Sequence, residues 1–206
     1  MGATSFWIEP LDLTEVQSLM AEFRAPWWIS GGWAIDLFAG EVTRDHDDVE
    51  ISVLEGDQDE LRSALAGMDL HVAHDGELTP WGAEQRIEHP LHQLWVRRDP
   101  AAPWSLEVLF EQHDGDEWVF RRDQRIRRPL GSIGWVTDDG LPVIAPEIAL
   151  LFKAKHRRPK DEHDLQVALP LLDHAARSWL RSSLHLIAPD HPWLGHLTPD
   201  PPANER

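Results

Sequence analysis

Six consecutive residues near the start of the chain, 48–53, alternate strictly between polar and apolar side chains. A period of two places successive side chains on opposite faces of an extended strand. The apolar positions are Val49, Ile51 and Val53, and the polar positions are Asp48, Glu50 and Ser52. The segment therefore predicts a strand with one apolar face and one face that carries two carboxylates.

A strand, a glycine turn and a helix are predicted just before this segment. Trp27, Trp28 and Ile29 form a short apolar strand that runs into the pair Gly31 and Gly32. Residues 33–39 are typical of a helix, which Gly40 would close.

The remaining pattern predicts an α/β (α+β) fold, in which a small mixed sheet has helices on one side. A first helix is expected from Thr14 to Phe23, because Thr14 and Gln17 match a capping box. Further helices are expected over 59–66, 147–156 (stopped by Pro159), 162–172 and 175–187, and strands over 70–73, 94–97, 106–111 and 118–121, the last two joined as a hairpin across Asp114 and Gly115. We expect a sheet-containing core over residues 1–143, a helical subdomain over 144–197 and a disordered tail over 198–206.

Charge and composition narrow the classes of partner. The chain has 206 residues, with 36 Asp and Glu against 19 Lys and Arg, for a formal net charge of -17. Long-range attraction to nucleic acid or to an anionic membrane is therefore not expected, and a divalent metal or an amine-bearing small molecule suits such a chain better.

The chain lacks cysteine, which excludes disulfides and thiolate metal sites. No signal peptide or membrane span is recognisable, so the default expectation is a cytoplasmic protein, while the oligomeric state stays open.

The chemistry concentrates where the glycine turn and the acidic strand follow each other. Side chains at i and i+2 of a strand project to the same side, so Asp48 and Glu50 could jointly hold hard cations, of which magnesium or manganese fits. Backbone amides at Gly31 and Gly32 could approach a phosphate, at the N-terminus of the helix that follows. Ser30 could add a hydroxyl donor. Taken singly, each feature is more often a solvated strand face or an ordinary turn, and their order and separation favour the functional interpretation.

The segments Ser30–Asp36 and Arg44–Ile51 resemble the signature of the polymerase-beta-like nucleotidyltransferase superfamily. The likeness is closest to aminoglycoside adenylyltransferases and, more loosely, to lincosamide nucleotidyltransferases. It implies metal-dependent transfer of a nucleoside monophosphate from a nucleoside triphosphate, ATP before the others, to a hydroxyl of a small molecule such as an aminoglycoside-like antibiotic. It also implies a nucleotide-binding role for Arg44, just before the acidic strand.

Such sites are completed by a third carboxylate on a neighbouring strand, as metal ligand or as base for the acceptor hydroxyl. Glu107 is the candidate, because it alternates with apolar Leu106 and Val108, and Glu111 is the fallback. An exposed strand glutamate is nearly as good an interpretation of Glu107. The chain departs from the family pattern, because Glu50 and Glu107 stand where aspartates are expected, which leaves full turnover open.

A second resemblance covers residues 146–161, which look like a lysine-bearing helix of resistance enzymes and of some nucleotidyltransferase toxins. It implies that Lys153, and next Lys160, neutralise the phosphates as pyrophosphate departs. A basic helix C-terminus that complements the helix dipole would alone explain Lys155, His156, Arg157 and Arg158. We expect Asp161 and Asp164 to cap or anchor the next helix.

A basic run over residues 121–128 could contact a phosphate or a polynucleotide, but protection of an edge strand is the favoured interpretation. The 12 histidines lack matched pairs at zinc-binding spacing.

The sequence leaves three functions open: a small-molecule transferase, a toxin-like transferase acting on RNA or protein, and a nucleotide-binding module without turnover.

Overall fold

The computed structural model describes residues 8–197, whose strands join in one mixed sheet. The strands are β1 (Trp27–Ile29), β2 (Glu50–Leu54), β3 (Asp69–His74), β4 (Glu77–Pro80), β5 (Gln93–Arg97), β6 (Leu106–Asp114), β7 (Glu117–Val119), β8 (Arg127–Pro129), β9 (Gly134–Val136) and β10 (Pro142–Ile144). Their order is β4-β3-β5-β6-β2-β1-β10-β9, and β7 and β8 extend the sheet from the end of β6. Because β2 pairs parallel with β6 and β1 pairs parallel with β10, while the other pairs are antiparallel, the predicted mixed sheet is confirmed.

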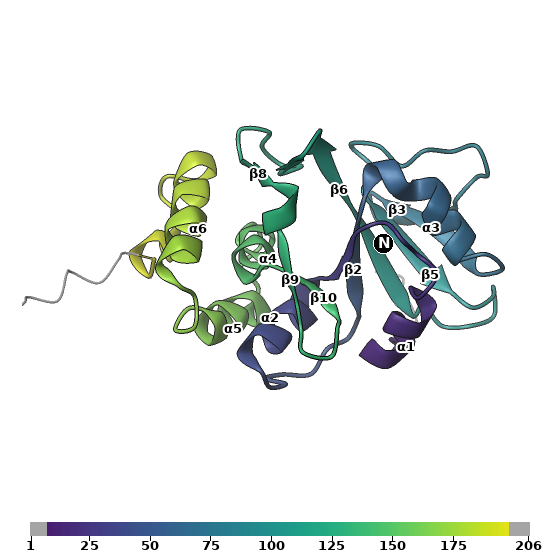
Figure 1. Cartoon of the computed structure of the whole chain (residues 1–206), viewed down its shortest axis with the longest axis horizontal. Coiled ribbons are helices and arrows are strands. Elements are labelled where there is room, and N and C mark those ends of the chain that lie inside the picture. Colours follow the sequence, from purple (N-terminus) through teal and green to yellow (C-terminus); the bar gives the residue numbers. More distant parts are fainter. Residues whose placement is uncertain (1–7, 198–206) are drawn as a thin grey trace, which may run out of the picture.

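Helices gather at both ends of the sheet (Figure 1). They are α1 (Leu13–Leu19), α2 (Gly31–Ala39), α3 (Gln58–Ala64), α4 (Pro146–Lys153), α5 (Pro159–Ala168) and α6 (His174–Ile187), with short 3-10 turns at Glu55–Asp57, Leu130–Ser132 and Pro192–Gly195. The later helices lie together, since α4 packs against α2, α5 and α6. The boundary that the sequence predicts between residues 143 and 144 falls inside β10, so the division into two units stays a prediction.

The first helix begins earlier than predicted. Asp12, and not Thr14, is the N-cap: its carboxylate accepts the Glu15 amide at 2.8 Å, and the Glu15 carboxylate accepts the Asp12 amide at 2.9 Å. This reciprocal pair satisfies donors that the first turn leaves free. The helix ends at Leu19, short of the predicted Phe23.

Two further differences lie in the C-terminal part. Pro159 opens α5 instead of merely stopping α4, because a proline in the first turn lacks an amide that would have no partner there. Strand β10 was not foreseen, since three residues carry too little pattern and their register comes from the distant partner, with Ile29 opposite Val143. The predicted tail over 198–206 lies outside the described residues.

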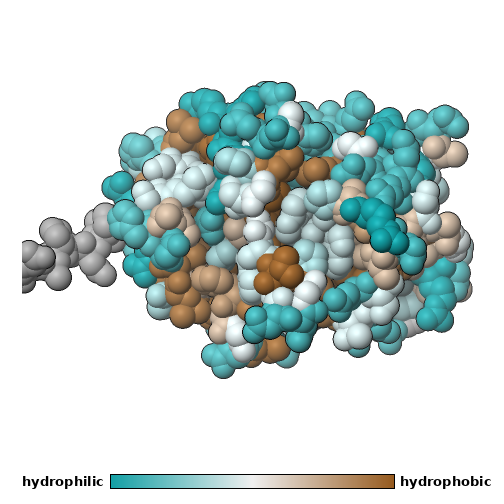
Figure 2. All heavy atoms as spheres, viewed as in Figure 1, coloured by the Kyte–Doolittle hydropathy of each residue, from teal (hydrophilic) through white to brown (hydrophobic). Residues whose placement is uncertain are grey.

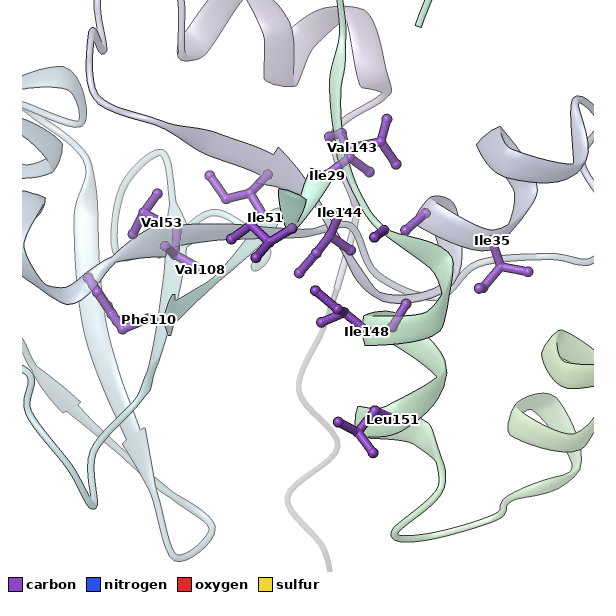
Figure 3. Close-up of a cluster of buried hydrophobic side chains, with 14 of the residues drawn as sticks. Ile29, Ile35, Ile51, Val53, Val108, Phe110, Val143, Ile144, Ile148 and Leu151 are labelled. Atoms are coloured by element: carbon purple, nitrogen blue, oxygen red, sulfur yellow. The ribbon is translucent and has the colours of Figure 1, made fainter. Parts of the chain in front are cut away.

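The alternation in β2 divides the sheet into a core face and a site face. Val49, Ile51 and Val53 are at most 1% exposed. Figure 3 shows Ile51 and Val53 beside apolar side chains of β6 and β10, with Ile148 and Leu151 of α4 nearby. The apolar face therefore anchors β2 in the core and leaves its polar face free for chemistry.

Hydrophilic side chains cover much of the face seen in Figure 2, with hydrophobic patches between them. Large exposed hydrophobic residues include Val42, Val136, Leu171 and Leu186. In the described part of the chain, no helix combines the length and the apolar character that crossing a bilayer requires.

Candidate active site

A pocket of about 200 Å³ lies where the turn after β1, the polar face of the sheet and α4 meet. The residues that line it are Ser30, Gly31, Glu50, Ser52, His92, Gln93, Glu107, Leu109, Glu111, Arg121, Arg122, Ile144, Ala149, Phe152, Lys153, His156 and Arg158. It therefore collects residues that are up to 128 positions apart, from Ser30 to Arg158.

Two carboxylates face each other across neighbouring strands of this pocket. Glu50 and Glu107 are partners in the parallel register of β2 and β6. Gln93 Nε2 donates a hydrogen bond to Glu107 Oε1 at 2.6 Å, which fixes one oxygen of that carboxylate. Burial, followed by the charges of Glu50 and Asp48, raises the pKa of Glu107 well above its ordinary value, and burial with the charge of Asp48 also raises the pKa of Glu50. The site thus concentrates negative charge that protein cations do not fully compensate.

Asp48 lies beside this pair but outside the pocket. The predicted strand begins two residues later than expected, at Glu50, so Asp48 belongs to the segment that leads into β2. Asp48 and Glu107 both line a small neighbouring cavity on the sheet. Among residues 8–197, no group of three or more His, Cys, Asp or Glu side chains is close enough to hold a metal by itself.

The glycine pair serves two different purposes. Gly31 has φ +63°, and a Cβ built there would overlap the Glu50 carboxylate. A Cβ at Gly32 would instead overlap the side chains of Arg44 and His46, away from the pocket. Gly31 therefore lets the acidic strand approach the start of α2, whereas Gly32 makes room for the loop between α2 and β2.

Ser30 lies at the N-cap of α2, lines the pocket, and is part of a short polar chain. Its Oγ is 2.7 Å from Ser52 Oγ, and Ser52 donates to Glu111 Oε1 at 3.1 Å. Glu111 is fully buried and also accepts a hydrogen bond from Trp118 Nε1 at 2.9 Å. Both oxygens of Glu111, the fallback for the third carboxylate, therefore accept hydrogen bonds from protein donors, whereas Glu107 accepts the Gln93 amide at Oε1 and lies opposite Glu50.

Of the three cations predicted to bind the nucleotide, Lys153 lines the pocket, whereas Arg44 and Lys160 do not. Lys153 lines the pocket, and its Nζ lies 2.7 Å from Asp164 Oδ2. Arg44 does not line it: its Nε and Nη2 donate to the same aspartate at 2.8 and 3.0 Å. Lys160 Nζ lies 3.9 Å from Asp47 Oδ2, also outside the pocket lining.

The two aspartates of α5 have different surroundings. Asp161 accepts the Arg158 amide at 2.8 Å and caps the helix as predicted. Asp164 is 0% exposed within α5 and pairs with Arg44 and with Lys153 of α4, so it anchors α5 to its neighbours, as predicted. Burial alone would raise the pKa of Asp164, but these two cations outweigh burial and lower it.

A buried pair that the sequence did not single out holds the loop between α2 and β2. Asp36 Oδ2 lies 2.6 Å from His46 Nε2, and both side chains are at most 3% exposed. Thr43 donates to the other Asp36 oxygen at 2.6 Å, and Trp33 stacks on His46 with centroids 4.4 Å apart. The sequence signal was an aspartate within an otherwise apolar helix. The pair positions the segment that delivers Asp48.

The sequence foresaw the basic wall of the pocket only in part. Arg121, Arg122 and Arg158 line the pocket together with Lys153, which was predicted. For the run over residues 121–128 the sequence left a phosphate contact open but favoured protection of an edge strand, whereas β7 ends at Val119, before the run. Acidic and basic walls thus share one pocket, as the binding of a metal-bound polyphosphate requires.

The chain is similar to known proteins in sequence and in fold. A sequence model of the family described as aminoglycoside-2''-adenylyltransferase matches residues 12–167. Curated relatives include a 2''-aminoglycoside nucleotidyltransferase from Escherichia coli, 31% identical over 83 residues, and one from Klebsiella pneumoniae, 40% identical over 48 residues. These alignments cover 37% and 22% of this chain and 47% and 27% of the relatives, so the first match spans about half the length of its relative.

Solved structures with a similar fold include a crystal structure of ANT(2'')-Ia in complex with adenylyl-2''-tobramycin. Its TM-score is 0.57 at 15% identity, over 85% of this chain and 97% of the other. A crystal structure of the lincosamide antibiotic adenylyltransferase LnuA with lincomycin bound has a TM-score of 0.52 at 17% identity, over 78% of this chain and 96% of the other. At these identities the likeness shows the fold alone. Because the family match covers most of the sequence and includes both the glycine turn and the carboxylate strands, the chain belongs to the aminoglycoside-2''-adenylyltransferase family.

Proposed function

We propose that the protein is a nucleotidyltransferase that moves a nucleoside monophosphate from a nucleoside triphosphate to a hydroxyl of a small molecule. The observation that carries this proposal is the register of Glu50 opposite Glu107 in a pocket that begins at Gly31. Family membership supports the reaction class. An aminoglycoside-like antibiotic is the acceptor to test first, since the relatives are named for that class.

The donor set fits a divalent cation such as Mg²⁺ or Mn²⁺. Glu50 and Glu107 offer hard oxygen ligands, and burial together with nearby negative charge raises the pKa of each, so a bound cation would favour their ionised forms. Mg²⁺ usually takes one or two carboxylates and completes its shell with water and substrate phosphates, so a closed cage of protein ligands is not needed. When bound, the ion would offset charge on the transferring phosphoryl group. Asp48 is the third proposed ligand.

The other proposed roles follow from the pocket lining. Ser30 and the backbone at Gly31, at the N-terminus of α2, hold the triphosphate by backbone amides and the helix dipole. Lys153 offsets the negative charge of the leaving pyrophosphate. Glu107 either holds the cation or orients the acceptor hydroxyl and accepts its proton, since it lies beside Glu50 in the pocket. Arg44 and Gly32 support the site indirectly, through Asp164 and the loop before β2, and Lys160 assists from outside the pocket.

The test is release of pyrophosphate from ATP, GTP, CTP and UTP with Mg²⁺, in the presence of a panel of aminoglycosides and lincosamides. We expect release with at least one pair, and a loss of about 100-fold or more in Asp48→Asn and Glu50→Gln, because cation stabilisation of such a transition state contributes several kcal/mol.

Two alternatives give different results in the same assay. A nucleotide-binding module would bind a triphosphate by calorimetry without releasing pyrophosphate, an outcome that the glutamates at positions 50 and 107 motivate. A toxin-like transferase would transfer labelled nucleotide to RNA or protein and ignore the antibiotics. Binding of none of the four nucleotides would contradict the proposal.

A further inference from the structure

The arginines over residues 121–128 fall into two groups, which differ in the partners of their guanidinium groups. Arg125, Arg127 and Arg128 pair with Asp123, Asp114 and Glu147 at 2.5, 2.9 and 2.7 Å. Arg121 and Arg122 line the pocket instead. Edge protection, which the sequence favoured, can therefore explain only the later members of the run.

Arg121 is a buried cation without a close partner. Its side chain is 9% exposed, and its nearest carboxylate oxygen, Glu111 Oε1, is 3.7 Å away. That oxygen already accepts a hydrogen bond from Ser52. In the described part of the chain, Arg121 Nη1 has no hydrogen-bond partner, which is costly for a buried charged donor.

Arg122 adds a second positive charge beside it. Its Nη1 donates to the carbonyl oxygen of Phe152 at 2.7 Å, and within residues 8–197 it forms no ion pair. The guanidinium carbons of Arg121 and Arg122 lie 4.2 and 5.2 Å from the centroid of the Phe152 ring. Burial, followed by the charge of Arg121, lowers the pKa of Arg122 to about 10, so Arg122 stays charged at neutral pH. Phe152 of α4 thus holds two like charges in one place.

We propose that Arg121 and Arg122 form an anion-binding subsite, which receives a phosphate group in the pocket. Planar guanidinium groups with free N–H donors suit phosphate oxygens by shape and by charge. The role of this subsite in a reaction rests on the proposed nucleotidyltransferase function. The phosphate belongs either to the polyphosphate of the nucleotide or to an anionic group of the acceptor.

The two sources are separated by calorimetry with two probes in the presence of Mg²⁺. Inorganic tripolyphosphate tests the nucleotide source, and inorganic phosphate added to protein saturated with ATP tests the acceptor source. We expect Arg121→Gln to weaken one of them by about tenfold or more, because it removes charged hydrogen bonds. Arg122→Gln, which alters a side chain without an ion pair in the described part of the chain, should weaken the same probe.

Matched controls come from the same run. Arg125→Gln and Arg127→Gln each remove one positive charge whose partner lies outside the pocket, so they should leave both affinities unchanged. Arg121→Lys separates charge from shape and should recover only part of the binding. Thermal denaturation of each variant checks that the fold is retained.

The outcomes distinguish this subsite from the proposed function. Equal affinities of both probes for the native protein and for Arg122→Gln would overturn the subsite, even if Arg121→Gln failed to fold. Failure of the native protein to bind any nucleoside triphosphate, while Arg122-dependent binding of tripolyphosphate persisted, would contradict the nucleotidyltransferase and leave the subsite standing.

Discussion

At the scale of single residues, the absence of a side chain at Gly31 shapes the site. Its φ of +63° lies in the left-handed region, and the Glu50 carboxylate occupies the space that a Cβ would need. Gly67 has a similar φ of +88° with nothing near its missing Cβ. A substitution at Gly67 would therefore add backbone strain alone, whereas the same substitution at Gly31 would add backbone strain and steric overlap with Glu50.

We expect Gly31→Ala to cost more stability than Gly67→Ala and to abolish nucleotide turnover. Left-handed backbone costs an alanine about 1–2 kcal/mol at either position. At Gly31 the added methyl group also displaces Glu50. Urea unfolding and pyrophosphate release would check this, and equal losses in the two variants would contradict the steric argument.

A second prediction concerns Asp164. Asp164→Ala should lower the free energy of unfolding by about 3–5 kcal/mol, because it leaves Arg44 and Lys153 without their buried partner. Asp59→Ala, which removes the exposed partner of Arg86, is the control and should change stability far less. Comparable losses in the two variants would show that the buried network contributes little.

At the scale of elements, the parallel pairing of β2 with β6 creates the acidic wall. Glu50 lies next to Glu107 because of the register in which β2 pairs with β6, and neither strand determines this register alone. Burial raises the pKa of both groups; the charge of Asp48 adds to the shift of Glu50, and the charges of Glu50 and Asp48 add to the shift of Glu107. The pair therefore opposes folding once both groups are ionised.

The sign of the resulting pH dependence follows from proton binding. A glutamate whose pKa is raised on folding holds its proton more tightly in the folded chain, so stability falls as pH rises from about 4.5 through the raised value. Glu107→Gln removes this contribution, and the variant should gain stability relative to the native protein over that window. Urea unfolding in EDTA between pH 4.5 and 8 measures it.

Glu77→Gln, on the exposed strand β4, controls for the loss of one negative charge. A difference between Glu107→Gln and the native protein that does not change with pH would show that folding does not raise the pKa of Glu107.

At the scale of the whole molecule, the pocket joins the sheet to the helices around α4. Figure 1 shows α4 beside β10, with α5 and α6 beyond it. A nucleotide bound with its metal would contact Glu50 on the sheet and Lys153 on α4, and would therefore tie the two parts of the molecule together.

We expect Mg²⁺ with the preferred nucleoside triphosphate to stabilise the fold. At 100 times the dissociation constant, binding contributes about 2.7 kcal/mol. For a chain of this size that corresponds to a rise in Tm of about 5–10 °C. Thermal denaturation with and without both ligands tests this, and Asp48→Asn should reduce the rise. A rise with triphosphate alone, equal with and without Mg²⁺, would contradict the metal assignment.

The sequence by itself determined the local units. Alternation identified the strand around Ile51, and the pair Gly31 and Gly32 identified the turn and the helix that follows, because these signals arise from the chain's own geometry. The spacing of Asp48 and Glu50, with the resemblance that it carried, indicated the family. Glu107 could be chosen because apolar neighbours flank it.

Only the tertiary structure decided how those units meet. The register of Glu50 against Glu107, the pairing of Arg44 with Asp164, and the turn of Arg121 into the pocket all join residues more than 50 positions apart. Local preference carries no information about such contacts. These contacts depend on how the whole core packs. Packing fixes the position of α4 relative to the sheet, and this position determines which charged side chains lie close to each other.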